Sequence, residues 1–271
     1  MPNYEKNGQK VWQLRTTRSQ WIRWGMWLAG LVLFLLSWQE ISDNTLWFMM
    51  DNVGEVVADI ATRATPPRWS YMNQLWIPIW DTLAIATLGT IFALFMAVPV
   101  AFLAARNTTP SRLLVRPIAL LIIVSTRSVN SLIWALLLVS IVGPGVLAGL
   151  IAISIRSIGF CAKLLYEAIE EINVVQVEAI RATGASPLQV MAYGIVPQIM
   201  PAFAGIAVFR WDINIRESTV LGLVGAGGIG LQLQSSLNVL AWPQVSLILL
   251  VILFAVIIGE WVSAKVRGAI I

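Results

Sequence analysis

Charged side chains interrupt several stretches of the sequence that are otherwise apolar enough to cross a lipid bilayer. Each such charge costs about 2.5–3.5 kcal/mol at the centre of a membrane helix, so it should face a protein interior or a water-filled cavity. The surplus of positive charge favours an anionic ligand over a cationic one, with the arginines lining its route. The charged residues are Arg127, Arg156, Arg210, Asp212, Arg216 and Glu217.

An alternative interpretation of these arginines is purely structural. Each guanidinium could pair with an acidic side chain, a backbone carbonyl or a lipid phosphate and only hold helices together. Asp212 and Arg216 are i, i+4 neighbours, which predicts an internal ion pair. For any single arginine the structural interpretation is at least as good as the functional one, and both stay open.

A polar cluster surrounds Arg127 in the middle of a predicted span. Backbone that leaves the helix inside a membrane is tolerated only where protein or a water-filled cavity covers it, so the cluster predicts a broken helix beside a cavity. Together with the charges above, it gives a candidate translocation pathway of Arg127, Ser128, Asn130, Arg156, Arg210, Asp212 and Arg216.

Composition identifies a protein that crosses the membrane several times. Of the 271 residues, 58% are hydrophobic and 12% are charged, which leaves far more apolar surface than a soluble domain can bury. The chain has no histidine and a single cysteine, Cys161, so we expect no metal site, no disulfide and no catalytic function. The net charge of +4 lies largely in short basic loops, so it does not indicate a nucleic-acid partner.

The apolar runs predict an all-α fold of about six membrane-spanning helices. Basic residues gather in the N-terminal arm, in the loop 106–116 and at 265–267, which all fall on one side if there are six spans; this places both termini in the cytoplasm. The predicted spans cover about residues 21–38, 76–104, 117–141, 146–165, 198–221 and 242–264.

Residues 1–75 are predicted to form an N-terminal arm, the first span and an extracytoplasmic connector, and residues 76–265 are predicted to form the transmembrane core. In the connector, residues 39–75, apolar side chains recur near helical spacing and predict an amphipathic helix on the outer membrane face. A loosely ordered connector is the equal alternative. The apolar side chains are Leu46, Trp47, Met50, Val53, Val57 and Ile60.

Residues 167–197, which we call the polar loop, are hydrophilic and helix-prone and lie between two apolar spans. Gly184 can adopt the positive φ that ends a helix, Ser186 can cap the next helix, and Pro187 suits its first turn. Two short helices are therefore predicted on either side of this break. Their apolar side chains predict a surface for a soluble partner; an ordinary connecting loop is the alternative. These side chains are Val174, Val175, Val177, Ile180 and Leu188.

The sequence gives no evidence of a nucleotide-binding site in this chain. The string at residues 225–230 fits G-x-G-x-x-G, but it lies among membrane spans and lacks the strand and the acidic residue that dinucleotide binding requires. We therefore expect these glycines to permit close helix packing, or to border one end of a pathway. The chain contains no G-x-x-x-x-G-K-[ST] motif, so an ATPase that drives transport would be a separate chain.

The polar loop resembles the cytoplasmic EAA loop of ABC importer permeases. Glu178, Ala179, Gly184 and Pro197 stand at the positions of that pattern, with Arg181 beside them, while Ile180, Gly194 and Val196 depart from it. The strings IWALLLVSIVG, RSIGFCAKLLYEAIEEI, RATGASPLQVMAYGIVPQIMP and ESTVLGLVGAGGIG are similar to phosphonate-type permeases of this superfamily. The resemblance covers residues 76–265 well and the N-terminal quarter poorly.

This resemblance implies a type I ABC importer permease fold in the bacterial inner membrane. The implied partners are the surrounding lipid bilayer, an ABC ATPase that docks on the polar loop and hydrolyses ATP, an extracytoplasmic binding protein, and a second permease copy. The chain itself would bind no cofactor and would move phosphonate by alternating access. Phosphite or phosphate import is the alternative, and a stand-alone secondary transporter or a membrane-embedded enzyme is a weaker one.

Overall fold

The computed structural model describes residues 3–6, 9–12, 17–45, 47 and 52–270, and these fall into two compact units divided after Asp59. In the first unit, β1 (Asn3–Lys6) and β2 (Gln9–Trp12) pair antiparallel, with Tyr4 opposite Val11. This hairpin was not predicted. Helix α1 (Thr17–Asp43) contains the predicted first span and buries none of its apolar stretch, as a lipid-facing helix would.

The connector contains a helix, α3 (Val53–Ala64), with Val53, Val56 and Val57 exposed. Part of the predicted amphipathic pattern therefore falls on a helix, and Trp47 precedes it in a turn. Leu46 and Met50 lie outside the described residues. The location of this helix on a membrane surface stays a prediction.

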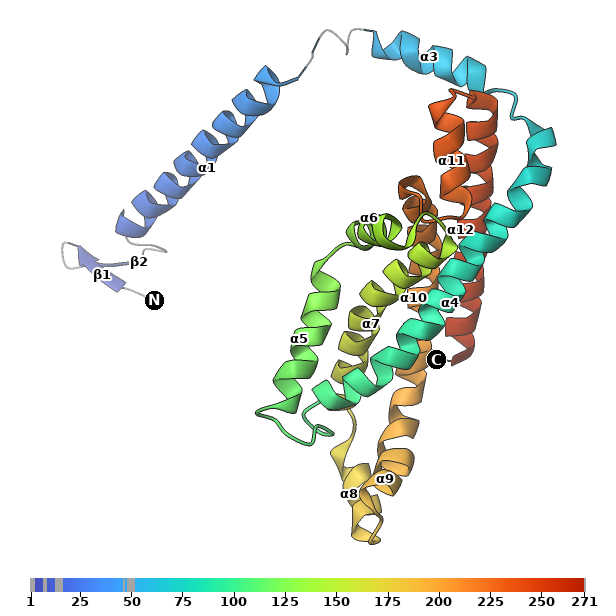
Figure 1. Cartoon of the computed structure of the whole chain (residues 1–271). Coiled ribbons are helices and arrows are strands. Elements are labelled where there is room, and N and C mark those ends of the chain that lie inside the picture. Colours follow the sequence, from blue (N-terminus) through green and yellow to red (C-terminus); the bar gives the residue numbers. More distant parts are fainter. Residues whose placement is uncertain (1–2, 7–8, 13–16, 46, 48–51, 271) are drawn as a thin grey trace. The chain divides into compact units, whose positions relative to one another are not determined.

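The second unit is a helical bundle, shown in Figure 1 from the short helix η1 to the C-terminus. Helices α8 and α9 project from one end of this bundle, and α12 runs towards that end. The elements are η1 (Trp69–Tyr71), α4 (Met72–Ala104), α5 (Val115–Ser128), α6 (Ser131–Val142), α7 (Val146–Glu170), α8 (Val174–Ala182), α9 (Pro187–Val190), the π-helical turn η2 (Met191–Ile195), α10 (Val196–Leu221), η3 (Gly222–Val224), α11 (Ile229–Asn238) and α12 (Trp242–Ile270).

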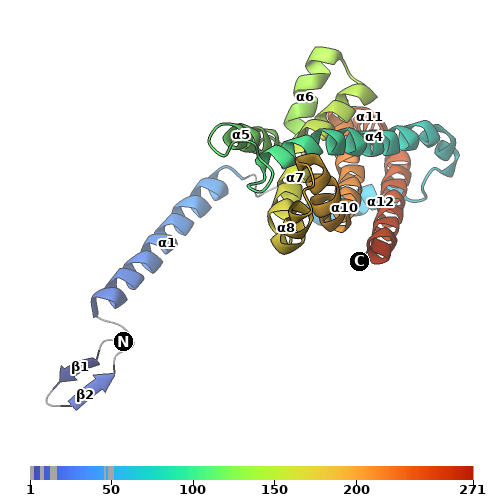
Figure 2. The same ribbon diagram turned by 90° about the horizontal axis from the view of Figure 1, so that it is seen from below.

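Helix α7 is the centre of the bundle and packs against α4, α5, α6 and α10. It lies beside α4 in both views (Figures 1 and 2). Small residues on one side of α4 make this approach possible, as the sequence predicted: a Cβ on Gly89 would be only 3.0 Å from Ile153 Cγ2, and Ser154 Oγ donates to Gly89 O. The buried small residues of α4 are Ala86, Gly89, Ala93, Ala97 and Ala101.

The described residues contain five stretches able to span a membrane, or six if α5 and α6 form one broken span. The axes of α5 and α6 differ in direction by 85° across the break between Ser128 and Ser131. The predicted third span is therefore interrupted where its polar cluster lies, as expected. The helices of the fourth and sixth predicted spans are longer than predicted, since α7 continues to Glu170 and α12 continues to Ile270.

The glycine-rich segment 222–230 packs backbone against backbone. It follows helix α10 rather than a strand, so the structural interpretation of its G-x-G-x-x-G string is confirmed. A Cβ on Gly222 would lie 2.6 Å from Gly227 O, and a Cβ on Gly228, whose φ is +74°, would lie 2.7 Å from Thr82 Oγ1. Thr82 Oγ1 also accepts from Ile229 N at 2.8 Å, which ties this segment to α4.

Candidate functional site

The polar loop folds as two short helices with a sharp bend between them, as predicted. Asn173 caps the first of them, α8, by accepting a hydrogen bond from Val175 N at 3.0 Å. Gly184 has φ +82°, which ends this helix in the left-handed region. Ser186 and Gln189 then form a capping box for α9, with Pro187 in its first turn.

The beginning of the polar loop differs from its prediction. The polar loop was expected to begin at residue 167, but Glu167 and Glu170 belong to the end of α7, whose apolar spacing simply continues. Val177 and Ile180 were expected to face a partner, but both turn inward. Val177 is buried, and Ile180 packs against the same core cluster. Because Gly194 has no side chain, Ile180 can lie over it, with Ile180 Cδ1 3.4 Å from the position of a Cβ.

The outer surface of the loop remains apolar in part. Leu188 is 77% exposed and Val175 is 72% exposed, and Val174 and Tyr193 are exposed as well. The four residues at positions of the family pattern, and Arg181 beside them, are also exposed, which leaves them available to a partner: Glu178, Ala179, Arg181, Gly184 and Pro197.

Two residues that the sequence analysis missed close the base of the loop. Gln198 Oε1 accepts from Asn173 N at 2.9 Å, and Gln198 Nε2 donates to Gly194 O at 2.7 Å. The first turn of α10 is thereby bonded to the residue that caps α8. Asn173 stands where a helix N-cap is expected, directly before the apolar residues of α8, but no local signal pairs it with Gln198.

Glu170 holds the neighbouring basic loop, residues 105–114, against the end of α7. Its Oε1 accepts from Arg106 N at 2.9 Å and from the Arg116 guanidinium at 3.3 Å. Asn107 Nδ2 donates to Ile169 O at 2.9 Å and so satisfies one of the carbonyls left open at a helix C-terminus. The basic loop and the polar loop thus share one rigid support.

Replacing Glu170 with alanine is expected to loosen the basic loop. Loss of the shared acceptor removes about 1–2 kcal/mol of local stability, so opening becomes about 5- to 30-fold more frequent. Trypsin cleavage after Arg112, followed by mass spectrometry of the purified chain, measures this opening. Glu167→Ala is the matched control because Glu167 pairs with Lys163 on its own helix. Equal cleavage rates in the two variants would contradict this assignment.

A second candidate site joins α7 and α10 within the membrane-spanning part. Arg156 donates to Glu217 Oε1 at 2.6 Å, and Arg210 donates to Glu217 Oε2 at 3.3 Å. Arg156 also approaches Ser131 Oγ, at 3.3 Å, where α6 begins after the break. The Arg210 guanidinium lies 5.1 Å from the centre of the Phe160 ring. We call Arg156, Arg210 and Glu217 the arginine cluster.

A buried polar network supports the arginine cluster. Arg210 Nε donates to Ser157 Oγ at 2.8 Å, and Ser157 Oγ donates to Asn214 Oδ1 at 3.3 Å. Asn214 Nδ2 then donates to Thr90 Oγ1 on α4 at 2.7 Å. Arg210, Ser157 and Asn214 are almost completely buried, so the network fixes Arg210 in place. The sequence-based list of pathway residues contains Arg210, but it lacks Glu217, Ser131, Ser157, Asn214 and Thr90.

The remaining predicted pathway residues lie elsewhere. Asp212 and Arg216 form the expected ion pair along α10. Asn130 caps α6 by accepting from Leu132 N, and Ser128 donates to Ser125 O, so both side chains support the helix break. Arg127 is exposed, and its aliphatic part packs over Gly159 of α7, one turn from Arg156.

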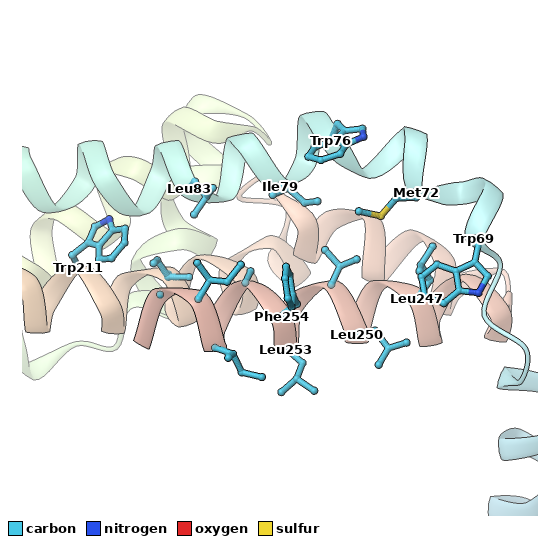
Figure 3. A pocket seen from close by; sticks show the side chains of 16 residues that line it. Trp69, Met72, Trp76, Ile79, Leu83, Trp211, Leu247, Leu250, Leu253 and Phe254 are labelled. Carbon is cyan, nitrogen blue, oxygen red and sulfur yellow. The ribbon is translucent and has the colours of Figure 1, made fainter. Parts of the chain in front are cut away.

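An apolar groove of about 630 Å³ lies between α4, α10 and α12, and Figure 3 shows Trp69, Met72, Trp76, Trp211 and Phe254 along it. No charged side chain is among the residues that line this groove. Because it offers no cation to balance an oxyanion, we do not assign an anionic ligand to it.

Comparison with known proteins identifies a family that shares this sequence pattern. Residues 97–267 match the family model described as "Binding-protein-dependent transport system inner membrane component". The phosphite transport system permease protein PtxC of Stutzerimonas stutzeri is 42% identical over 78% of this chain and 76% of its own length. The phosphate-import permease protein PhnE of Mycolicibacterium smegmatis is 38% identical over 81% of this chain and 41% of its own length.

A solved structure shows the same fold. A chain of the MetNI methionine ABC transporter, in a study of its inward-facing conformations, aligns over 75% of this chain and 99% of its own length, with a TM-score of 0.65 and 21% identity. The helical bundle, the described spans and the family match together show that the chain belongs to the binding-protein-dependent transport system inner membrane component family, the permeases of ABC importers.

Proposed function

We propose that this permease moves a phosphorus oxyanion, with phosphonate and phosphite as the leading substrates, into the bacterial cytoplasm across the inner membrane. The observation that carries the substrate class is similarity over most of the chain to permeases named for phosphite and phosphate transport. The arginine cluster supports it, because two guanidiniums and one carboxylate leave a net positive charge inside the membrane-spanning part. Arg127 of α5 packs over Gly159, which lies one turn from Arg156 along α7, and it adds a further positive charge.

Topology follows from charge in this proposal. If α5 and α6 count as one broken span, the chain crosses the membrane six times and both termini share one side with the polar loop. The basic loop 105–114 and the C-terminal Arg267 belong to that side, which the positive-inside rule assigns to the cytoplasm. Alternating access would then open the pathway in turn to the outside and to the cytoplasm.

The partners in this proposal are those of an ABC importer. One ATPase docks on the exposed apolar side chains of the polar loop, and an extracytoplasmic binding protein delivers the substrate. Since each chain presents one polar loop and ATPases of this class act in pairs, a second permease copy completes the pathway. This chain binds no cofactor, and ATP is hydrolysed by the partner.

Replacing Leu188 with aspartate tests the docking surface. A charge in a desolvated apolar contact is expected to cost about 2 kcal/mol or more, which weakens ATPase binding about 30-fold or more. The measurement is the amount of ATPase that co-purifies with the tagged permease, at equal permease levels in the membrane. Leu188→Met, which keeps the apolar contact, is the control. Full recovery of ATPase with the aspartate variant would count against this surface.

Uptake by the reconstituted importer tests the substrate. Proteoliposomes that contain the permease, its ATPase and its binding protein are expected to accumulate phosphite, phosphonate or phosphate only when ATP is supplied on the side of the membrane where the ATPase is bound. Uptake by the permease alone would favour a secondary transporter instead.

A further inference from the structure

Glu217 bridges the two guanidiniums of the arginine cluster in the way that an oxyanion would. Each of its carboxylate oxygens accepts from a different arginine, Oε1 from Arg156 on α7 and Oε2 from Arg210 on α10. A phosphonate, phosphite or phosphate group presents oxygens that guanidiniums recognise through the same charge-assisted hydrogen bonds. The carboxylate therefore occupies a position whose donors suit a phosphorus oxyanion.

The polar groups around this position come from three separate elements. Besides the two arginines, Ser131 Oγ lies 3.3 Å from the Arg156 guanidinium at the first residue of α6, where the positive end of the helix dipole lies. Trp134, one turn along α6, has a buried Nε1–H without a hydrogen-bond partner among the described residues. It packs against a buried core cluster that includes Ile153 and Leu221, which lie within about one turn of Arg156 and Glu217.

Exposure within the cluster is graded. The side chain of Arg156 is 33% exposed and that of Glu217 is 16% exposed, whereas that of Arg210 is 2% exposed. An incoming anion could thus reach Arg156 and displace the Glu217 carboxylate without unpacking α7 from α10. Arg210 is fixed from behind by Ser157, so it stays in position while its counter-ion changes.

We propose that Arg156 and Arg210 form an oxyanion-binding site in which Glu217 is an internal competitor, displaced when the substrate passes. This inference rests on the proposed transport of a phosphorus oxyanion. The carboxylate keeps the two arginines paired while no substrate is present, and it sets how tightly the substrate is held. Displacement by a substrate oxyanion exchanges one set of charge-assisted hydrogen bonds for another, so binding remains weak enough for release.

The test is equilibrium binding of radiolabelled phosphate, and of phosphite in competition with it, to the purified permease in detergent. Glu217→Gln removes the competing charge and is expected to lower the dissociation constant about tenfold or more. In the double variant Arg156→Gln, Glu217→Gln the net charge of the cluster returns to its native value, but the second donor is missing. This variant is expected to bind at least about tenfold more weakly than Glu217→Gln.

Controls separate this site from a general effect of charge. Glu260→Gln removes an exposed carboxylate from α12 and should leave phosphate binding unchanged. An unchanged dissociation constant in Glu217→Gln, or equal binding by that variant and the double variant, would overturn the inference. If Glu217→Gln is too unstable to purify, Arg156→Gln alone decides, because it should weaken binding about tenfold relative to the native chain.

The binding and uptake experiments distinguish failure of the proposed substrate from failure of the proposed role of Glu217. If the reconstituted importer takes up no phosphorus oxyanion, the proposed substrate is wrong whatever the variants bind. If it takes up phosphite but Glu217→Gln binds as the native chain does, only the role of Glu217 is wrong.

Discussion

Replacing Gly230 with alanine is expected to destabilise the permease severely, although the same change usually strengthens a helix. Gly230 lies in the first turn of α11, and its Cβ would overlap Thr219 O and lie 2.8 Å from Gly222 Cα. Both neighbours are backbone atoms, which cannot rotate away as a flexible side chain can. Overpacking of this kind costs about 3 kcal/mol or more, which exceeds the gain of about 1 kcal/mol in helix propensity.

The measurement is the thermal midpoint and yield of the detergent-solubilised chain on size-exclusion chromatography. The midpoint should fall by about 5 °C or more. Gly268→Ala is the matched control, because Gly268 is exposed in α12 and no atom lies within 4 Å of its Cβ position. That variant should be as stable as the native chain or slightly more stable. A normal midpoint for Gly230→Ala would show that α10 and α11 are not packed this closely.

Replacing Gly184 with valine is expected to uncouple ATP hydrolysis from uptake while the chain still folds and inserts. The residue has φ +82°, a conformation that costs a β-branched side chain about 1–2 kcal/mol or more. No atom lies within 4 Å of a Cβ at this position, so the effect is confined to the bend between α8 and α9. The native bend should become about 5- to 30-fold less populated.

Uptake and ATPase activity of the reconstituted importer, measured on the same preparation, report this loss. We expect uptake per ATP hydrolysed to fall several-fold, with unchanged amounts of permease in the membrane. Gly184→Asn is the control, since asparagine adopts the left-handed region far more readily than valine. Coupled uptake at the native ratio in the valine variant would remove the polar loop from the proposed mechanism.

Local features of the sequence were enough to predict most of the elements. Each predicted span is helical in the described structure, the third one as two helices, because a span must satisfy its backbone hydrogen bonds internally. The bend in the polar loop was also predictable, since Gly184, Ser186 and Pro187 determine the conformation of their own backbone and of the helical turn that follows. The break between α5 and α6 falls in the polar cluster that indicated it.

Side-chain orientation in the polar loop could not be predicted in the same way. Val175 and Val177 are equally apolar, but one is exposed and the other is buried. The difference depends on where α8 meets the π-helical turn before α10, and on Gly194 leaving space for Ile180. A short helix has too few turns for its own periodicity to reveal which face is covered.

The sequence by itself determined a helical membrane protein, the positions of its spans, and a polar loop that bends at Gly184. Only the tertiary structure decided which intramembrane charges meet. Arg156 and Glu217 are 61 residues apart in the chain, and Arg210 reaches the same carboxylate from two turns earlier on α10. Local spacing shows that such charges need partners, because unpaired charges in the membrane are costly, but the partner is chosen by the packing of α7 against α10.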